Sequence, residues 1–334
     1  MITLQRERVH EEQPRIVQAA KQIWEQRVLV LGNGKVGKAL VRLLSENNID
    51  IVAIIKSDGV YRQRGEGKIE KINDLSQWPI YALQAHATFN ALPTEGEGEI
   101  ESTYVEPILN LREPVITAAK GLVAARWDLV EKNADLLSIT ATVGAPTRML
   151  KEMFNLKGEY DREGKVMQEI VGILNGTTNL VCDLASRGVP VKEAVRYAVK
   201  RGFAETDNGT PRKTLEDEFD DWKRKAAIVA NASGMLQKKV KPEDIMLAVP
   251  ESDDELEKCL ATKRCVVRIT REGIEAGFIE DTNAPWLPRG PHNLLRVDGK
   301  VIARGPGAGA ELTAGVMFED FTDRFPGVAT EWYR

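Results

Sequence analysis

The first half of the chain alternates short apolar runs with stretches of helical periodicity. Val28–Leu31 and Ile51–Ile55 have the composition of buried strands, and between them Ala39–Leu44 has the apolar spacing of a helix that buries one face. Further apolar runs predict strands at Ala87–Leu92, Pro114–Ala118 and Leu136–Thr142. Strands that alternate with helices form parallel sheets, so this half predicts an α/β fold.

The rest of the chain has a less regular pattern. Before the first strand, apolar residues share one helical face, which predicts an amphipathic helix within residues 1–26; they are Ile16, Ala19, Ala20 and Ile23. Beyond Thr147 the pattern mixes helices and strands. We expect a helix near Arg148–Phe154, a charged turn around Tyr160–Gly164, a strand from Val171, helices at Pro190–Arg201 and Asp221–Gln237, and strands from Arg264 onward, including a hairpin at Arg296–Gly305 with an Asp-Gly turn.

Composition excludes several classes of protein. The formal net charge of −4 over 334 residues does not favour general nucleic-acid binding. The apolar runs are short and the N-terminal residues are polar, which argues against a membrane span or a secretory signal and favours a cytoplasmic protein. Neither the cysteines nor the histidines have metal-ligand spacing, so no disulfide or metal site is expected from Cys182, Cys259, Cys265, His10, His86 and His292.

A glycine-rich motif, GNGKVG, follows the first strand and opens the next helix. It consists of Gly32, Asn33, Gly34, Lys35, Val36 and Gly37. Glycines in this position allow a tight turn and the close approach of a pyrophosphate, which the positive end of the helix also attracts. The strand-turn-helix-strand order favours dinucleotide binding, and the alternative is a tight turn that binds no ligand.

The end of the second strand carries the signal for cofactor preference. An acidic residue at this position would bind the ribose of NAD, but the chain has Lys56 and Ser57. A cation there favours the 2′-phosphate of NADP, with NAD as the alternative cofactor. Arg62 and Arg64 are further candidates for the phosphate, and a solvent-exposed lysine at position 56 is the alternative without a ligand.

Two lysines occupy positions suited to proton transfer. Lys120, in ITAAKG, follows an apolar run at the expected carboxyl end of a strand, the edge where open parallel sheets bind ligands. Lys225 lies four residues after Asp221 on a predicted helix and directly before the apolar run Ala226–Ala230. A partly buried lysine of this kind can act as a general acid or base beside carboxylates such as Glu205. The alternatives are a solvated Lys120 and an ordinary helix-stabilising ion pair between Asp221 and Lys225.

Two polar or glycine-rich stretches border apolar segments. VGILNGTTNLVCDL begins as a strand and then changes to amides, glycine and hydroxyls at Asn175–Thr178. This change is typical of a strand-to-helix cap with Thr177 or Thr178 as the capping residue. The second stretch, Gly305–Gly315, has small residues that allow close approach of a ligand or of another element. Close packing without a ligand is the alternative there.

Taken in order, these pieces resemble the homoserine dehydrogenase family over nearly the whole chain beyond the N-terminal helix. The matching stretches are GNGKVG, ITAAKG, ATVGAP, GILNGTTN, GFAETD, DDWKRKAAI and GPGAGAELTAG. The resemblance implies a Rossmann-type parallel-sheet nucleotide-binding domain, residues 27–146 plus 305–334, interrupted by an α+β substrate-binding and dimerisation domain, residues 147–304. It also implies a homodimer that interconverts L-homoserine and L-aspartate 4-semialdehyde with NADP or NAD, in threonine and methionine biosynthesis. No regulatory amino-acid-binding domain is expected after Gly315.

The resemblance also implies roles for individual residues. Lys225 would be the acid/base lysine near the reacting oxygen, and Lys120 the second lysine of the proton path. Glu205 and Asp221 would bind the substrate ammonium, with Glu216 or Asp217 as a third carboxylate. A wall at the junction of cofactor and substrate would consist of Asn175, Gly176, Thr177 and Thr178. Beyond the glycine loop, cofactor contacts are implied for Lys56, Ser57, Leu92, Pro93, Lys120, Gly307, Gly309 and Thr313.

The chain departs from the family pattern at several positions. Ala119 replaces an asparagine, and Thr140 replaces an acidic residue that helps to hold a monovalent cation, so no metal site is predicted. The insertion NGTPRKTLE, residues 208–216, lengthens the carboxylate-bearing loop. This loop leaves open a dehydrogenase of the same fold that acts on another small amino or hydroxy acid. A non-catalytic nucleotide-binding regulatory homologue is the other alternative, although the presence of both Lys120 and Lys225 speaks against it.

Overall fold

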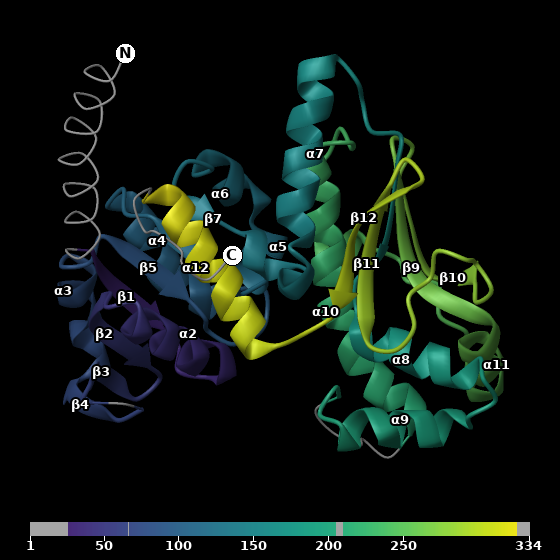
Figure 1. Cartoon of the computed structure of the whole chain (residues 1–334), viewed down its shortest axis with the longest axis horizontal. Coiled ribbons are helices and arrows are strands. Elements are labelled where there is room, and N and C mark those ends of the chain that lie inside the picture. The colour runs from purple at the N-terminus through teal and green to yellow at the C-terminus, as the bar shows by residue number, and fades with distance from the viewer. Residues whose placement is uncertain (1–25, 66, 205–209, 326–334) are drawn as a thin grey trace, which may run out of the picture.

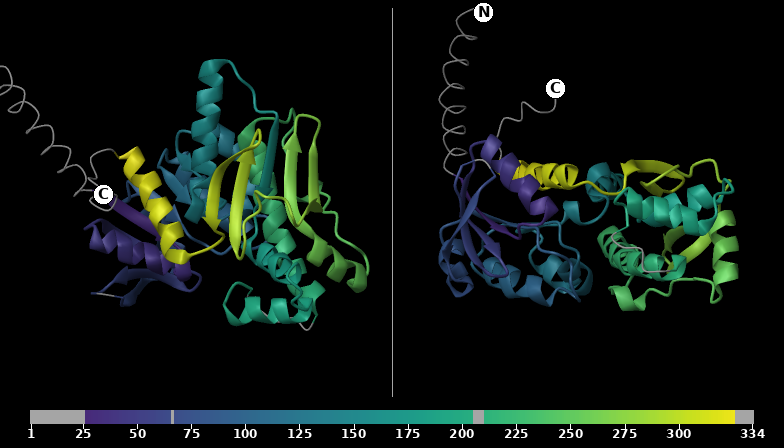
Figure 2. Two further views of the ribbon diagram at one scale, coloured as in Figure 1. Left: turned by 45° about the vertical axis from the view of Figure 1, so that its right-hand side comes forward. Right: turned by 90° about the horizontal axis from the view of Figure 1, so that it is seen from below.

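The computed structural model describes residues 26–65, 67–204 and 210–325, so the N-terminal helix expected within residues 1–26 lies outside the described part of the chain. The described residues form two sheets that lie side by side, each covered by helices (Figures 1 and 2). The predicted fold class, a parallel-sheet α/β part with a second α+β part, is confirmed. None of the helices between residues 26 and 325 has an apolar stretch long enough to cross a bilayer.

The first sheet has the strand order β4-β3-β2-β1-β5-β6-β7. Its parallel strands are β1 (Arg27–Leu31), β2 (Asp50–Lys56), β5 (Ala87–Asn90), β6 (Val115–Thr117) and β7 (Leu137–Ser138). Helices connect them, namely α2 (Lys35–Glu46), α3 (Trp78–Ala82), α4 (Glu99–Asn110), α5 (Gly121–Ala125) and α6 (Trp127–Lys132). The apolar run of β1 is fully buried because this central strand is covered on both faces.

An antiparallel extension at one edge was not predicted. β3 (Gly59–Gln63) pairs with β2, and β4 (Ile69–Asn73) pairs with β3. Both strands lie at the edge of the sheet and are largely polar, so they lack the continuous apolar run that marks the buried parallel strands.

The second sheet is antiparallel, with the order β10-β9-β8-β11-β12. Its strands are β8 (Glu169–Ile173), β9 (Lys263–Thr270), β10 (Ile274–Asp281), β11 (His292–Val297) and β12 (Lys300–Pro306). The helices of this part are α7 (Met149–Glu163), α8 (Gly176–Ala185), α9 (Val191–Lys200), α10 (Pro211–Ser233) and α11 (Asp253–Thr262). The predicted hairpin is present as β11–β12, and its turn residues Asp298 and Gly299 have φ values of 47° and 84°, as a type I′ turn requires.

The chain returns to the first sheet through α12 (Ala310–Arg324), the yellow helix that lies beside α2 in Figure 1. Phe321 on α12 packs against Phe89 of β5, with ring centroids 5.4 Å apart. β12 continues to Pro306, and the chain then leaves the second sheet.

Three predicted elements differ from the structure. Only Leu137–Ser138 of the predicted strand Leu136–Thr142 is a strand, because the hydroxyls of Thr140 and Thr142 bond to Asp320 and to the Ile139 carbonyl, and Thr140–Thr142 forms a 3-10 turn. The expected charged turn around Tyr160 belongs to α7, which ends at a left-handed Gly164. α10 begins ten residues before the predicted start, since Thr210 caps it and Pro211 occupies its first position.

Asp320 is buried where the return helix α12 meets the turn after β7. Thr140 Oγ1 lies 2.7 and 2.8 Å from its two carboxylate oxygens. Burial raises the pKa of Asp320 to about 6, although the Thr140 hydrogen bond and Lys151 of α7 favour the carboxylate; the neighbouring Asp323 and Glu319 add to the rise. The folded protein therefore retains a proton here that the unfolded chain releases at lower pH.

This raised pKa predicts a pH-dependent gain in stability for Asp320→Asn. The contribution of the protonated carboxyl is present below the usual value of 3.8 and is lost as pH rises to about 6. At pH 7 the variant should raise the free energy of unfolding by about 1–3 kcal/mol. At about pH 4 it should change little, since the folded wild type is then protonated. Urea titrations measure both values, with the more exposed Asp323→Asn as control; an equal effect at the two pH values would contradict the assignment.

Candidate active site

The glycine loop between β1 and α2 leaves open space at a helix N-terminus. Gly32 has φ +92°, and a Cβ there would lie 2.5 Å from the Ala91 carbonyl oxygen. A Cβ on Gly37 would lie 2.3 Å from the Gly32 carbonyl oxygen, so α2 packs directly on the turn. At Gly34, by contrast, a Cβ would meet no described atom within 4 Å. A tight turn that is open on one side fits a pyrophosphate at the first turn of α2.

The end of β2 carries an acidic residue that the sequence analysis did not select. Lys56 Nζ lies 3.5 Å from Asp58 Oδ1 and 4.1 Å from the centroid of the Tyr61 ring. The Tyr61 hydroxyl donates to Asp58 Oδ2 at 2.7 Å, and this bond, with the Lys56 ammonium, lowers the pKa of Asp58. Ser57 is exposed in the same turn. Lys56 is thus already paired with a carboxylate. The sequence analysis considered only the position of Lys56 at the end of the strand and did not predict this pair.

The two arginines that follow have different surroundings. Arg64 Nε pairs with Glu70 across the β3–β4 hairpin at 2.9 Å. Arg62 lines a hollow of about 1260 Å³ between α2 and this hairpin, together with Asn33 of the glycine loop. Of the two, Arg62 therefore faces open space that is continuous with the loop.

The carboxyl ends of β5 and β6 hold the segment around Lys120. Asn90 at the end of β5 donates through Nδ2 to Thr117 Oγ1 at 3.1 Å and accepts from the Leu92 N–H at 3.3 Å. Lys120 N–H donates to Thr94 Oγ1 at 3.2 Å, just beyond Pro93. The following helix α5 is capped from a distance by buried Glu101, whose Oε2 accepts from Leu122 N–H at 3.0 Å. Burial raises the pKa of Glu101.

One carboxylate joins the two candidate lysines. Asp221 Oδ2 lies 2.6 Å from Lys225 Nζ, and Asp221 Oδ1 lies 3.3 Å from Lys120 Nζ. Lys225 Nζ also donates to the Leu174 carbonyl oxygen at 3.1 Å, and its side chain is only 11% exposed. The structure thus brings together Lys120 from the edge of the first sheet and the α10 pair of the second part.

The pKa values of two neighbouring carboxyl groups are shifted in opposite directions. Burial alone would raise the pKa of Asp221, but the ammonium groups of Lys225 and Lys120 outweigh it and hold that pKa well below its usual range. Burial raises the pKa of Glu218, and the charge of Asp221 adds to the rise, although Asn175 and Lys225 favour the carboxylate. Asp221 is therefore the fixed anion of the site, whereas the pKa of Glu218 lies above the usual value for a glutamate.

Glu218 is the α10 carboxylate beside Asn175 and Asp221, whereas the sequence analysis selected Glu216 or Asp217 as the third carboxylate. Glu216 is exposed on α10, and the side chain of Asp217 and the whole of Glu205 lie outside the described residues. Asn175 Nδ2 donates to Glu218 Oε2 at 2.6 Å. Positions 218, 221 and 225 are three and four residues apart on one helix and share a face, whereas position 216 does not. Counting back from Lys225 with the helical period would have found Glu218.

The stretch from Asn175 to Thr178 forms a polar wall beside this cluster. Asn175, rather than Thr177 or Thr178, caps α8, because its Oδ1 accepts from Thr178 N–H at 2.8 Å. Its amide faces Glu218 and lies 3.4 Å from Asp221 Oδ2. Thr177 Oγ1 donates to the Phe203 carbonyl at 2.8 Å. A single asparagine thus both starts the helix and lines the carboxylate cluster.

The closing glycine stretch reaches the same wall. A Cβ on Gly176 would lie 2.6 Å from the Pro291 carbonyl oxygen and 3.3 Å from Gly307 Cα, so both glycines are required by close backbone contact. Gly309, with φ +157°, precedes α12, and its carbonyl accepts from Thr313 N–H at 2.9 Å. The Gly307–Thr313 segment therefore leads from the wall into the first turn of α12.

An open glycine loop on a parallel sheet, with a lysine–carboxylate cluster at the carboxyl edge of the same sheet, defines the class of nicotinamide-dependent dehydrogenases. The family model described as homoserine dehydrogenase matches residues 155–322, which is half of the chain. The chain belongs to the homoserine dehydrogenase family.

Individual proteins agree with this assignment. The chain is 27% identical to a homoserine dehydrogenase of Sulfurisphaera tokodaii, over 85% of this chain and 93% of the relative. It is 24% identical to an NAD(+)-dependent homoserine dehydrogenase of Pseudomonas canavaninivorans, over 89% and 95% of the two chains. A hyperthermophilic archaeal homoserine dehydrogenase solved in complex with NADPH has the same fold, with a TM-score of 0.66 at 19% identity over 90% of this chain and 97% of that one.

Proposed function

We propose that this chain is a homoserine dehydrogenase that interconverts L-homoserine and L-aspartate 4-semialdehyde, in threonine and methionine biosynthesis. The observation that carries the proposal is the contact of Asp221 with both Lys225 and Lys120 at the carboxyl edge of a sheet with an open glycine loop. Family membership supports the choice of substrate. The sequence resemblance further supports a cytoplasmic homodimer, and light scattering after gel filtration tests the dimer.

The residues present fit a nicotinamide dinucleotide. The turn at Gly32, the open space at Gly34 and the N-terminus of α2 suit a pyrophosphate, as set out above. Leu92, Pro93 and Lys120, at the ends of β5 and β6, lie at the edge along which such a ligand would extend. When bound, the nicotinamide supplies the hydride exchange, and the protein supplies orientation and proton transfer.

Lys225 is proposed as the acid/base group. In the direction of reduction its ammonium donates a proton to the oxygen of the aldehyde, and in the direction of oxidation the neutral amine accepts the hydroxyl proton. Asp221 and the Leu174 carbonyl hold Lys225 Nζ in place. Because its pKa is held low, Asp221 orients the two lysines rather than carrying the proton itself. Lys120 contacts the other carboxylate oxygen of Asp221. We propose that it offsets the negative charge of Asp221 and is the second lysine of the proton path.

Glu218 is proposed as the carboxylate that binds the substrate ammonium. Asp221 already contacts two cations, so a third cation needs another carboxylate. Glu218 lies on the same face of α10, and its raised pKa means that an arriving ammonium would favour its ionised form. The resemblance assigns this ammonium to Glu205 and Asp221, and Glu205 lies outside the described residues.

We propose NADP as the preferred cofactor, with the balance set by Lys56 and Asp58. The Lys56 ammonium attracts a 2′-phosphate, and the Asp58 carboxylate 3.5 Å away opposes it. Lys56→Met should therefore lower the ratio of kcat/KM for NADP to that for NAD, and Asp58→Asn should raise it, each by roughly threefold to tenfold for one exposed charge. Arg64→Met, which removes a cation paired with Glu70, is the control. A ratio unchanged in both variants would remove this pair from cofactor selection.

The test of the proposed function is a comparison of substrates. Steady-state kinetics with L-homoserine, with 4-hydroxybutyrate, which lacks the ammonium, and with an amino alcohol one methylene longer separates homoserine dehydrogenase from a dehydrogenase of another small acid. We expect kcat/KM for L-homoserine to exceed that for 4-hydroxybutyrate by on the order of a hundredfold, because the analogue leaves the half-buried Glu218 carboxylate without a cation. Preference for either analogue would reject the substrate assignment, and nucleotide binding without turnover would favour the regulatory alternative.

A further inference from the structure

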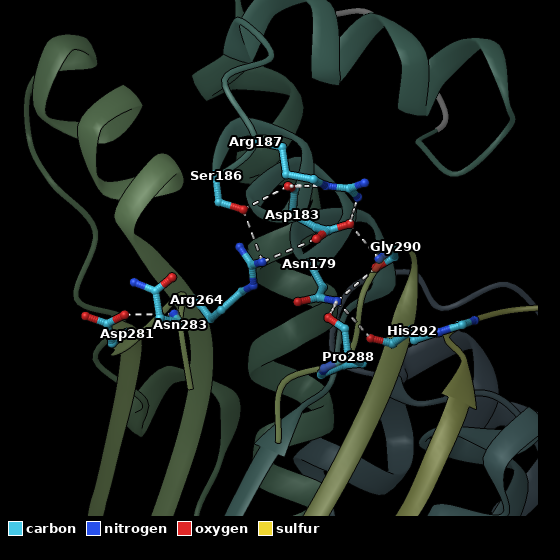
Figure 3. A network of polar contacts seen from close by, with 10 residues as sticks. All are labelled: Asn179, Asp183, Ser186, Arg187, Arg264, Asp281, Asn283, Pro288, Gly290 and His292. Atoms are coloured by element: carbon cyan, nitrogen blue, oxygen red, sulfur yellow. Dashed lines mark hydrogen bonds and ion pairs between the residues drawn. The ribbon is translucent and has the colours of Figure 1, made fainter. Parts of the chain in front are cut away.

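A buried polar network holds residues 288–292, the segment that leads into β11 and that we call the strap (Figure 3). Asn179 and Asp183 lie four residues apart on α8 and both face it. Asn179 Nδ2 lies 2.8 Å from the Gly290 carbonyl oxygen and within 3.3 Å of those of His292 and Pro288. The Gly290 N–H donates to Asp183 Oδ2 at 2.9 Å. Both sides of Gly290 are therefore held by α8.

Two arginines fix the carboxylate of Asp183. Arg187 Nη2, one helical turn away, contacts Oδ2, and Arg264 Nη2 of β9 lies 3.5 Å from Oδ1. Arg264 is 3% exposed and also donates to Ser186 Oγ at 3.4 Å, while its Nε and Nη1 have no hydrogen-bond partner among the described residues. A buried pair with unsatisfied donors contributes little net stability. The Asp183–Arg264 pair therefore matters for where it holds the Asp183 carboxylate rather than for its contribution to stability.

The strap and the residue that follows it each contact the proposed active site. The Pro291 carbonyl oxygen accepts from Gly307 N–H at 3.0 Å and also packs against Gly176, so the strap sets the spacing between the wall and the closing glycine segment. The next residue after the strap, fully buried Asn293, donates through Nδ2 to the Leu174 carbonyl at 3.2 Å. That carbonyl also accepts from Lys225 Nζ.

We propose that Asn179 and Asp183 are positioning residues of the proposed dehydrogenase. They hold the strap. Pro291 of the strap fixes the Gly307 segment, and Asn293, which follows the strap, fixes the Leu174 carbonyl that orients Lys225. The inference rests on the proposed function for its turnover readout. The Kd for NADPH reports separately on the position of the Gly307 segment, because its measurement needs no turnover.

Asn179→Ala in the full chain tests the proposal most directly, because it removes the amide that faces three strap carbonyls and leaves the charged groups in place. We expect Kd for NADPH to rise by roughly tenfold and kcat to fall by on the order of tenfold to a hundredfold, as small displacements of reacting groups do. Cofactor fluorescence and steady-state rates measure the two quantities. Gly290→Ala, whose added Cβ meets open space but whose φ is +66°, disturbs the strap from its other side and should have the same direction of effect.

Leu256→Ala is the matched control, since it removes a buried side chain from α11 in the same part of the molecule. It should lower the melting temperature and leave Kd and kcat unchanged. If Asn179→Ala and Gly290→Ala behave like Leu256→Ala, the positioning role is wrong. If Asn179→Ala does not fold, Gly290→Ala alone decides in the same way. A wild type that binds NADPH but does not turn over homoserine would reject the proposed function, while the Kd values would still test the strap.

Discussion

Lys225→Ala is expected to lower kcat by about 10²–10⁴-fold, the usual contribution of a positioned acid or base. Lys225 Nζ lies against Asp221 and the Leu174 carbonyl rather than against the glycine loop, so its loss removes the proton donor without disturbing the pyrophosphate site. The Kd for NADPH should therefore stay within about twofold of the wild type. Steady-state rates in both directions and a fluorescence titration with NADPH measure these quantities.

The control for this variant is Lys223→Ala, which removes a lysine from the same helix two residues earlier and hence from a different face. It should leave turnover near that of the wild type. Equal losses of turnover and nucleotide affinity in Lys225→Ala would indicate that the site has collapsed and would count against the acid/base role.

Asp221→Asn is the second variant with a large expected effect. It removes the charge that Lys225 and Lys120 share and keeps nearly the same shape, so the two ammonium groups lose their common partner and repel each other. We expect kcat/KM for L-homoserine to fall by roughly 10²–10³-fold, because both the orientation of Lys225 and the charge balance between the two lysines are lost. Steady-state kinetics at several substrate concentrations separates the change in kcat from that in KM.

Asp220→Asn provides the comparison, since Asp220 is the adjacent, exposed carboxylate on α10. Its kinetic constants should match those of the wild type. If Asp221→Asn gave the same kinetic constants as Asp220→Asn, the contacts of Asp221 with Lys225 and Lys120 would be ordinary surface ion pairs. They would then no longer support the proposed function.

Much of the parallel-sheet part could be predicted because its strands are buried on both faces. The apolar runs that form β1, β2 and β5 and the glycine turn before α2 are local features, and the structure has them where the sequence placed them. β3 and β4 could not be predicted in this way, since both are short, largely polar strands without a continuous apolar run. Strand β7 ends earlier than predicted because the Thr140 hydroxyl bonds to Asp320, 180 residues away in the chain.

The candidate site was predictable in part for the same reason. The spacing of Asp221 and Lys225 is a local feature of one helix, but the contact of Asp221 with Lys120 joins two sheets and has no sequence signal other than the family resemblance. Glu218 has a local signal in the helical period. Asn179 and Asp183 also had one, because two polar residues four apart in an apolar segment are expected to bond to something buried. The identity of their partner, the strap, depends on tertiary structure alone.

The measurement that tests the central claim most directly is the formation of NADPH and NADH by the purified chain in the presence of L-homoserine, followed by absorbance of the reduced nicotinamide and by chemical identification of the product. The account predicts reduction that depends on homoserine, L-aspartate 4-semialdehyde as the product, and the loss of this activity in Lys225→Ala. Nucleotide binding without reduction of either cofactor, or undiminished reduction in Lys225→Ala, would contradict it.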